Sequence, residues 1–474
     1  MADRKRYHRL INNTAIIALG QIGSKVLVYL LVRLYTSVMS TAEYSVASNI
    51  TETSTLLIPL ISLGIAEAVF RFAMDKKYSE KDVFTSGFVV FFAGCLLFAA
   101  AIPILIAIPY FDGSEWLVVV YVIASILHSL CSQFIRAKGW FKLYAVQGLI
   151  NTALTITFNI IFLIPLKMSF TGYVLSVAVA DTLTMLFIVL VAKLWRYIDF
   201  RAVGGKTVRD MLRYSIPMIP TTIFWWVTNV SDRFMVTGFV GDDVNGLYTA
   251  AYKIPTLLMV LSGIFVNAWR NSAVDEKDSS DYKVFFGNVF DLFSDIIFLI
   301  AAILITFTPV ITNLMFAKAY HEAWVYIPIL TCAMVFFNFV SFTGSVYVVS
   351  KKTVWSFITS LAGAVLNVVM NLMLIPWLGA YGAAIATAAS FVLVFILRII
   401  TTRKMVEYPV NMAKLITNTV VMAALAAVMT IRFPGWLIFE ILLFVFALAV
   451  NAPPIIRATR KILASRRGKG KSDN

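Results

Sequence analysis

Long apolar segments separated by short polar ones run along almost the entire chain. Most of them are close to the ~20 residues that an α-helix needs to cross a bilayer. The pattern predicts an all-α, polytopic membrane protein with fourteen transmembrane helices and short connections, which leave no room for a separate catalytic domain. The predicted spans are residues 10–33, 44–67, 83–109, 115–135, 143–165, 171–193, 214–239, 246–269, 285–309, 324–349, 353–375, 381–400, 413–431 and 434–451.

The composition agrees with this class and gives it a sidedness. Hydrophobic residues make up 60% of the 474 residues and charged residues only 14%, whereas a soluble domain carries about 25% charged residues. The net charge of +15 would suggest nucleic-acid binding in a soluble protein. Here most of the 40 Lys and Arg residues lie in every second connection and near both chain ends, as they do in cytoplasmic segments. We therefore expect both termini in the cytoplasm and no nucleic-acid partner.

Two short similarities indicate an internal repeat. Gly64 is followed by Arg71 at the spacing that separates Gly263 from Arg270, and the segments FNIIFLIP and MNLMLIP follow in the same order. Parallel repeats of six spans are one way in which two-lobed transporters are built. Arg71 and Arg270 then take equivalent places at cytoplasmic helix ends. They either set the topology or make the first contact with an anionic head group.

The repeat predicts an organisation in two six-helix lobes followed by two extra helices. The predicted parts are an N-terminal lobe (1–200), a C-terminal lobe (201–405), two extra helices (406–455) and a basic, disordered cytoplasmic tail (456–474).

The segment MLRYSIPMIPTTIFWWVTNVSDRFMVTGFVGDDVNGLYTAAYKIPTLLMVLSGIFVNAWRNSA, residues 211–273, resembles the bacterial polysaccharide transporter family. This family includes the O-antigen flippases and belongs to the multidrug/oligosaccharidyl-lipid/polysaccharide (MOP) exporter superfamily. One departure is Ser45, where members usually carry glycine. The matching positions are Tyr214–Pro217, Pro220, Asp232-Arg233, Gly246–Tyr248, Lys253–Pro255, Ala268-Trp269, Glu43-Tyr44 and Leu63-Gly64 to Arg71.

The resemblance implies two six-helix lobes around a central cavity that opens alternately to each side of the bacterial cytoplasmic membrane. The implied substrate is an oligosaccharide on a polyprenyl pyrophosphate, moved from the inner to the outer leaflet. The partners expected with it are membrane lipids and, for a monomeric transporter, the polymerase or other assembly proteins of a surface polysaccharide. The identity of the sugar does not follow.

Polar side chains recur on one face of several predicted spans. An ionisable group at mid-bilayer costs at least ~2.5–3.5 kcal/mol, so each is a candidate for function. Cationic side chains would neutralise the pyrophosphate, Trp225 would stack on sugar, and amide or hydroxyl groups would bind sugar hydroxyls. The predicted substrate-binding residues are Lys25, Arg33, Glu52, Trp225, Asn229, Asp232, Arg233 and Lys253.

An alternative interpretation is that these charges only pair with one another. Glu52 would then bind Lys25 or Lys253, and Asp232 would bind Arg233 or a neighbour. The two interpretations are compatible if an ion pair acts as a gate, in which the substrate competes with one member of the pair for the other.

Other intramembrane ionisable groups raise the question of a coupling ion. Asp291 and Asp295 lie one turn apart and either bind H⁺ or Na⁺ or are simply solvated near the inner interface. His128 is either a proton site or a hydrogen-bonded packing residue, and Asp181 and Glu440 have no assigned role. The three cysteines and three histidines lack metal-ligand spacing, so no metal site or cofactor is predicted.

Three functions compete with the leading hypothesis of a lipid-linked oligosaccharide flippase. A lipid II flippase would share the basic cavity. A multidrug-type, cation-coupled exporter predicts a smaller and more acidic cavity, against which Lys25 and Lys253 argue. A polymerase or ligase would need catalytic groups in long outer loops, and no nucleotide, metal or nucleophile motif appears, so we expect a protein that is not an enzyme.

Overall fold

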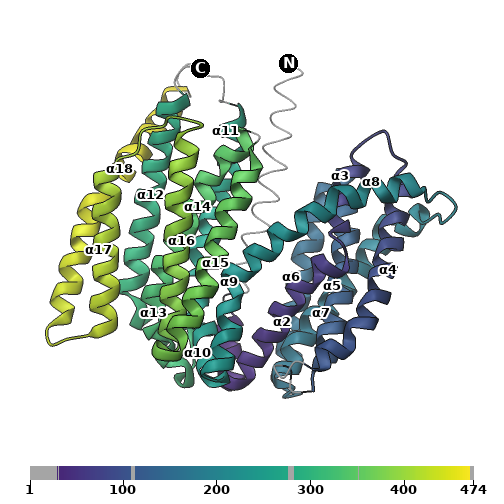
Figure 1. Ribbon diagram of the computed structural model, residues 1–474, viewed down its shortest axis with the longest axis horizontal. Helices are drawn as coiled ribbons and strands as arrows, with labels where there is room; N and C mark the ends of the chain where they lie inside the picture. The colour runs from purple at the N-terminus through teal and green to yellow at the C-terminus, as the bar shows by residue number, and fades with distance from the viewer. Residues whose placement is uncertain are drawn as a thin grey trace. The chain divides into compact units, whose positions relative to one another are not determined.

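The structure is a computed structural model, and it describes residues 29, 31–107, 111, 113–275, 282–350 and 352–469. These residues form α-helices and three short 3-10 helices, without a strand among them (Figure 1). The α-helices are α2 (Thr41–Ile61), α3 (Ile65–Ala73), α4 (Glu80–Ile106), α5 (Glu115–Ala137), α6 (Phe141–Leu163), α7 (Ser169–Ala192), α8 (Gly205–Ser215), α9 (Ile219–Phe239), α10 (Asp242–Lys253), α11 (Thr256–Asp275), α12 (Tyr282–Thr306), α13 (Thr308–Met315), α14 (Ile327–Val349), α15 (Thr353–Leu378), α16 (Ala380–Arg403), α17 (Met412–Ile431) and α18 (Trp436–Lys469). The 3-10 helices are η1 (Leu194–Tyr197), η2 (Ile216–Met218) and η3 (Lys318–Val325).

The chain divides into two compact units. The N-terminal unit comprises Met1–Thr237 and Gly241–Gly246, and the C-terminal unit comprises Gly238–Val240 and Leu247–Asn474. The assignment of lobes by the repeat, with a boundary near residue 200, stays a prediction.

In the N-terminal unit, α5 and α7 pack together, with α2, α3 and α6 beside them. One apolar core lies where α3, α4 and α5 meet and includes Val69, Phe84 and Phe134, all fully buried. The second core joins α2, α4 and α5 through residues such as Ile50 and Val122. Besides these apolar cores, α5 and α7 make a polar contact, in which the Ser125 hydroxyl donates to Asp181 (2.6 Å).

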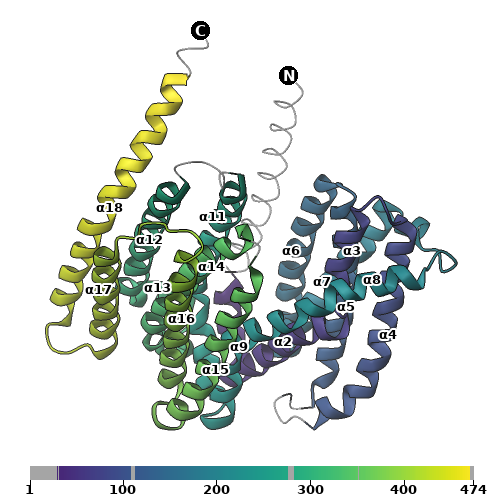
Figure 2. The same cartoon turned by 45° about the horizontal axis from the view of Figure 1, so that its top comes forward.

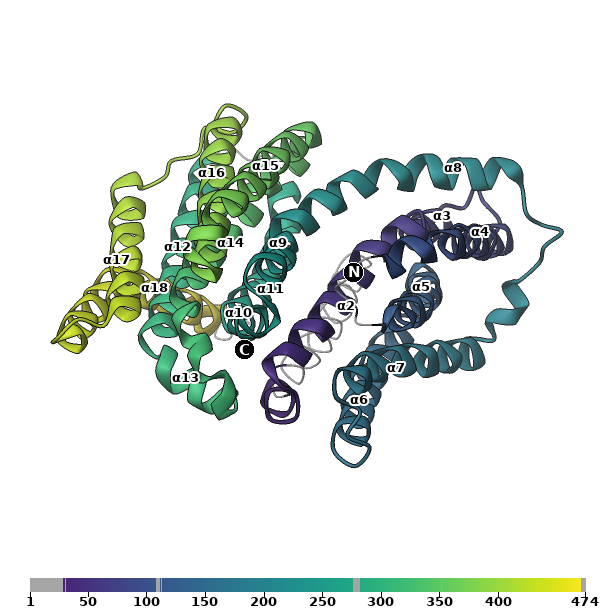
Figure 3. The ribbon, with the colours of Figure 1, turned by 60° about the horizontal axis from the view of Figure 1, so that its bottom comes forward.

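The short amphipathic helix α8 lies against α3 and α4 (Figure 3). Asp82 of α4 caps it by accepting hydrogen bonds from the backbone of Gly204 (3.0 Å) and the hydroxyl of Thr207 (2.5 Å). A carboxylate at a helix N-terminus satisfies amide groups that the helix leaves free. Asp210 of the same helix accepts a hydrogen bond from the Tyr78 hydroxyl (2.9 Å), and this hydrogen bond raises the pKa of Tyr78.

The C-terminal unit is built around α14, which packs against α11, α12 and α16. Its core is rich in phenylalanine: Phe342 lies 5.3 Å from Phe286 and 5.4 Å from Phe290, measured between ring centroids. The buried Arg398 of α16 donates to the Val340 carbonyl of α14 (2.7 Å) and so ties two helices together.

The last two helices, α17 and α18, lie beside α12 in the C-terminal unit (Figure 2). Asn418 and Asn451 exchange two hydrogen bonds of 2.8 and 3.0 Å between α17 and α18. Paired amides of this kind satisfy polar groups that lipid cannot. The predicted two-helix extension is thus held together by its own polar contact.

Thirteen of the predicted spans overlap described helices, while the first, 10–33, lies mostly outside the described residues. Ten described helices are long and apolar enough to cross a membrane, or eleven if α2 and α3 form one bent span. The protein is therefore a multi-pass membrane protein, but the count of fourteen is not confirmed. Asp232 and Arg233 lower the hydropathy of α9, and Pro255 divides the predicted span 246–269 into α10 and α11.

Two predicted segments need correction. The span 44–67 is two helices bent by 52°, because Gly64 takes a left-handed conformation (φ 64°) between α2 and α3. The tail 456–474 is not wholly irregular, because α18 continues to Lys469. Its Ala, Leu, Arg and Lys residues are strong helix formers, so a basic sequence here does not exclude a helix.

Candidate functional site

The first polar cluster of the N-terminal unit joins α2 to α9. The carboxylate of Glu52 forms an ion pair with the guanidinium of Arg233. The indole of Trp226 donates to the Glu52 backbone carbonyl (2.9 Å), and one turn earlier on α2 the amide of Asn49 donates to the hydroxyl of Thr237 (3.3 Å). The side chains of Ser45, Asn49 and Glu52 on α2 therefore face α9.

The start of α10 closes the same face of α2. The hydroxyl of Ser45 donates to Asp242 (2.6 Å) and that of Thr41 to Asp243 (2.5 Å). At Gly246 an added Cβ would lie 1.9 Å from the Thr41 carbonyl oxygen, so only glycine fits. Ser45, the departure from the family pattern, has a role in this contact, because its hydroxyl also accepts from Asn245 (2.8 Å).

The structure brings five of the predicted substrate-binding residues together on α2 and α9. Arg233 is the partner that the described residues show for Glu52, and a pairing of Glu52 with Lys25 or Lys253 stays a prediction. Asp232 is fully buried, and its carboxylate accepts the Arg233 backbone N–H (2.9 Å). Asn229 donates its side-chain amide to the Trp225 carbonyl (2.6 Å), so this amide folds back on its own helix.

The remaining predicted cations lie on other segments or outside the described residues. Lys25 lies outside the described residues. Arg33 is exposed, Arg71 is exposed in the last turn of α3, and Lys253 is half-buried at the last residue of α10, in the C-terminal unit. Arg270 lies on α11. Their roles toward a substrate stay predictions.

The two aspartates of α12 meet the polar start of α17. Asp295 is buried and lies 2.5 Å from the ammonium of Lys414. Asp291 accepts the backbone N–H of Asn411 at 3.5 Å. The Asp295–Lys414 pair fastens α17 to α12 within the C-terminal unit, and the burial of Asp295 does not fit the alternative in which it is simply solvated. An ion-coupling role of Asp295 stays a prediction.

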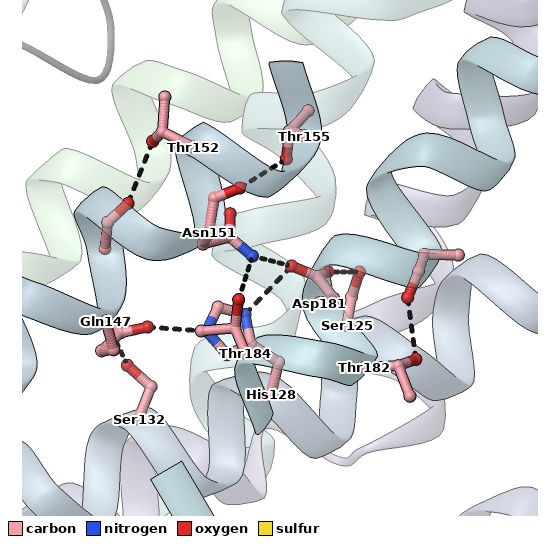
Figure 4. Close-up of polar contacts among 12 residues, drawn as sticks. Ser125, His128, Ser132, Gln147, Asn151, Thr152, Thr155, Asp181, Thr182 and Thr184 are labelled. Carbon is pink, nitrogen blue, oxygen red and sulfur yellow. Dashed lines mark hydrogen bonds and ion pairs between the residues drawn. The ribbon is translucent and has the colours of Figure 1, made fainter. Parts of the chain in front are cut away.

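A second polar cluster lies buried among α5, α6 and α7 (Figure 4). The Nδ1 atom of His128 is 3.1 Å from Oδ1 of Asp181, and Nε2 is 2.8 Å from Oε1 of Gln147. Asp181 also accepts hydrogen bonds from Ser125 (2.6 Å) and Asn151 (2.8 Å). A carboxylate with three donors is well stabilised in its charged form.

Sequence reasoning considered His128 and Asp181 separately and missed that they touch. The signal that could have joined them is a polar stripe on each of three consecutive helices. On α5 the stripe is Ser125, His128 and Ser132, on α6 it is Gln147 and Asn151, and on α7 it is Asp181 and Thr184.

Glu440 of α18 is a single buried carboxyl in the C-terminal unit. One oxygen accepts from the Thr306 hydroxyl of α12 (3.0 Å), and the other has no hydrogen-bond partner among the described residues. Within the same residues no group of three or more His, Cys, Asp or Glu side chains could hold a metal ion.

The fold and its polar spans define the class of protein. The structure is similar to that of the lipid II flippase MurJ in an inward closed conformation, with a TM-score of 0.70, 14% sequence identity, and coverage of 95% of this chain and 99% of that one. An inward-facing multidrug resistance MATE family transporter of the MOP superfamily gives a TM-score of 0.65 at 13% identity, covering 82% and 98%. A MOP superfamily transporter from Pyrococcus furiosus, described as having a reversed binding-pocket polarity, gives a TM-score of 0.59 at 13% sequence identity. The match covers 82% of this chain and 95% of that one.

The fold is therefore that of MOP superfamily transporters, as the sequence predicted. The sequence profile of the polysaccharide biosynthesis protein family matches residues 10–270, more than half of the chain. The chain belongs to this family. A comparison with curated proteins found no match.

Proposed function

We propose that this protein moves a polyprenyl-pyrophosphate-linked oligosaccharide from the cytoplasmic to the outer leaflet of the bacterial cytoplasmic membrane by alternating access. The observation that carries the proposal is the combination of family and fold. The chain belongs to a polysaccharide biosynthesis family, and its fold matches that of a lipid II flippase along nearly its whole length. Family and fold together fit transport of a sugar-bearing lipid.

The polar groups of α2 and α9 support this proposal. A pyrophosphate needs cationic donors in a site away from bulk water. Arg233 is such a donor, and it is held by Glu52 in a chain of which 60% of the residues are hydrophobic. A pyrophosphate that competes with Glu52 for Arg233 would exchange one charge-assisted pair for another. The ion pair would then be a gate that substrate opens.

The expected setting follows from the charge distribution. Cytoplasmic termini agree with the Lys and Arg bias of alternate connections. The protein would act as a monomer beside membrane lipids and hand its cargo to polymerase or assembly proteins. It would break and make no covalent bond, so it would not be an enzyme.

Transport of lipid II is the second candidate function, and the fold match to MurJ favours it. Both substrates carry a polyprenyl pyrophosphate, so the contacts of Arg233 do not separate them. Essentiality does, because loss of lipid II transport stops growth, whereas loss of a surface polysaccharide need not.

A deletion strain tests the proposed function. The strain should accumulate polyprenyl-linked repeat units that face the cytoplasm and should lose surface polymer. The intact gene should reverse both defects. An Arg233→Gln copy, expressed at the same level, should correct neither the accumulation nor the loss of surface polymer. Normal polymer without accumulation would contradict the proposal. Arrested growth with accumulated lipid II would favour the second candidate, and drug sensitivity with normal polymer would favour multidrug export.

A further inference from the structure

We infer that the cluster around His128 binds one exchangeable proton and that this proton is the ion coupled to transport. Proton binding itself stands on the geometry of the N-terminal unit alone. Its coupling to transport rests on the proposed function.

The hydrogen-bond pattern shown corresponds to a charged His128. A carboxylate oxygen and an amide oxygen only accept hydrogen bonds. Nδ1 faces Asp181 at 3.1 Å, and Nε2 faces the amide oxygen of Gln147 at 2.8 Å. The amide nitrogen of Gln147 donates in turn to the Ser132 hydroxyl at 3.2 Å. In this arrangement both ring nitrogens donate, so the ring is an imidazolium paired with a carboxylate.

The same atoms allow a second arrangement with one proton fewer. If the Gln147 amide turns over, its nitrogen donates to Nε2 of His128, and the Ser132 hydroxyl donates to its oxygen. Nδ1 still donates to Asp181, so the neutral ring keeps both hydrogen bonds. A hydroxyl can donate or accept, and a neutral imidazole has one donor and one acceptor. No buried polar atom of the cluster loses its partner when the proton leaves.

Asp181 keeps its charge in both arrangements. Ser125 and Asn151 donate to it at 2.6 and 2.8 Å, and neither bond depends on the state of the ring. Loss of the proton therefore leaves a net negative charge held by fixed donors. The side chains of His128 and Asp181 retain 17% and 11% of their exposure, so the pair is not fully enclosed by the protein.

Helix packing connects this cluster to the ion pair of α2 and α9. The helix α2, which carries Glu52, packs against both α5 and α7, which carry His128 and Asp181. We expect a change of one charge at His128 to reach the proposed substrate gate through these helix contacts. Besides His128 and Asp181, the charged and titratable groups on α5, α6, α7 and the helices that pack against α5 are Glu43, Tyr44 and Glu52 of α2, Glu67 and Arg71 of α3, Glu80, Lys81, Asp82 and Cys95 of α4, Glu115, Tyr121, Cys131 and Arg136 of α5, Lys142 and Tyr144 of α6, and Tyr173 of α7.

Nitrogen NMR on a chain with a single histidine tests the proton site. The chain has three histidines, so the His8→Gln/His321→Gln protein, labelled with ¹⁵N-histidine in nanodiscs, reports His128 alone. At neutral pH both ring nitrogens should carry a proton, and at high pH one should lose it. In the same background, Asp181→Asn should give a neutral ring at neutral pH. Gln147→Glu, which can only accept, should hold the imidazolium into the alkaline range. A single neutral tautomer from pH 5 to pH 9 would overturn the inference.

Reconstituted transport tests the coupling. In proteoliposomes loaded with a fluorescent lipid-linked oligosaccharide, a pH gradient should change the flipping rate of the wild type and of His321→Gln. The His128→Gln protein, shown to be folded by size-exclusion chromatography, should still flip the lipid without a pH gradient. Its flipping rate should not change when the gradient is applied. If His128→Gln responds as the wild type does, the coupling inference is wrong and the proposed function stands. If the wild type flips no such lipid, the proposed function is wrong and the coupling with it, while the NMR result decides proton binding separately.

Discussion

Glu52 of α2 and Arg233 of α9 form an ion pair across 181 residues of sequence. The pair places a guanidinium within the N-terminal unit at Glu52, whose backbone carbonyl also accepts a hydrogen bond from the indole of Trp226. Side-chain exposures of 10% for Arg233 and 26% for Glu52 mean that the pair is partly shielded but still reachable.

Breaking this pair should affect transport more than folding. Arg233→Gln removes the cation and should lower polymer export about tenfold or more, which corresponds to ~1.4 kcal/mol of lost binding free energy. Glu52→Gln should stay active, because the cation survives. Breaking a fully buried pair costs ~3–5 kcal/mol, and the cost should be smaller here because Glu52 is partly exposed. Polymer export and membrane protein level measured together check the prediction. Equal loss of protein level in both variants would point to a structural pair.

The two predicted lysines provide a separate test of the cavity hypothesis. Lys25→Ala and Lys253→Ala should each abolish polymer export at near-normal protein level, because each removes a cation predicted to bind the pyrophosphate. Surface polymer and immunoblots of the same cells give the answer. Full activity of both variants would remove these lysines from the proposed binding site.

Gly246 should tolerate no side chain. The Cβ of Gly246→Ala would overlap the Thr41 carbonyl at 1.9 Å, and overpacking of this kind costs typically ~1–3 kcal/mol. Gly148→Ala in α6 is the matched control, because nothing lies within 4 Å of the added Cβ. Thermal unfolding in detergent should show a lower midpoint for Gly246→Ala and no loss for Gly148→Ala. Equal midpoints would mean that α2 and α10 do not approach so closely.

The Asp295–Lys414 pair should be structural. Asp295→Asn leaves Lys414 facing a neutral amide and should lower thermal stability, whereas the double change to Asn and Met should recover part of it. The response of flipping to a pH gradient should survive in Asp295→Asn. Loss of that response with stability unchanged would make Asp295 the coupling carboxylate.

Hydropathy and charge alone predicted the helical class, the positions of most spans and the multi-pass character. They could not predict the bend between α2 and α3, because it depends on the backbone conformation of Gly64. Charge type marked Glu52 and Arg233 as important, but which cation meets Glu52 depends on how α2 and α9 are rotated about their axes. The contact between His128 and Asp181 could not be predicted for the same reason, because residue spacing within one helix does not show which face the next helix turns toward it.

The most direct measurement is flipping by the purified protein. A polyprenyl-pyrophosphate oligosaccharide with a fluorescent sugar label is placed in both leaflets of proteoliposomes, and an impermeant quencher is added outside. Protein-free vesicles should keep the inner-leaflet signal. We predict that the wild type exposes that signal to the quencher and that Arg233→Gln does so far more slowly. An inner-leaflet signal that stays protected with correctly folded wild type would contradict the account.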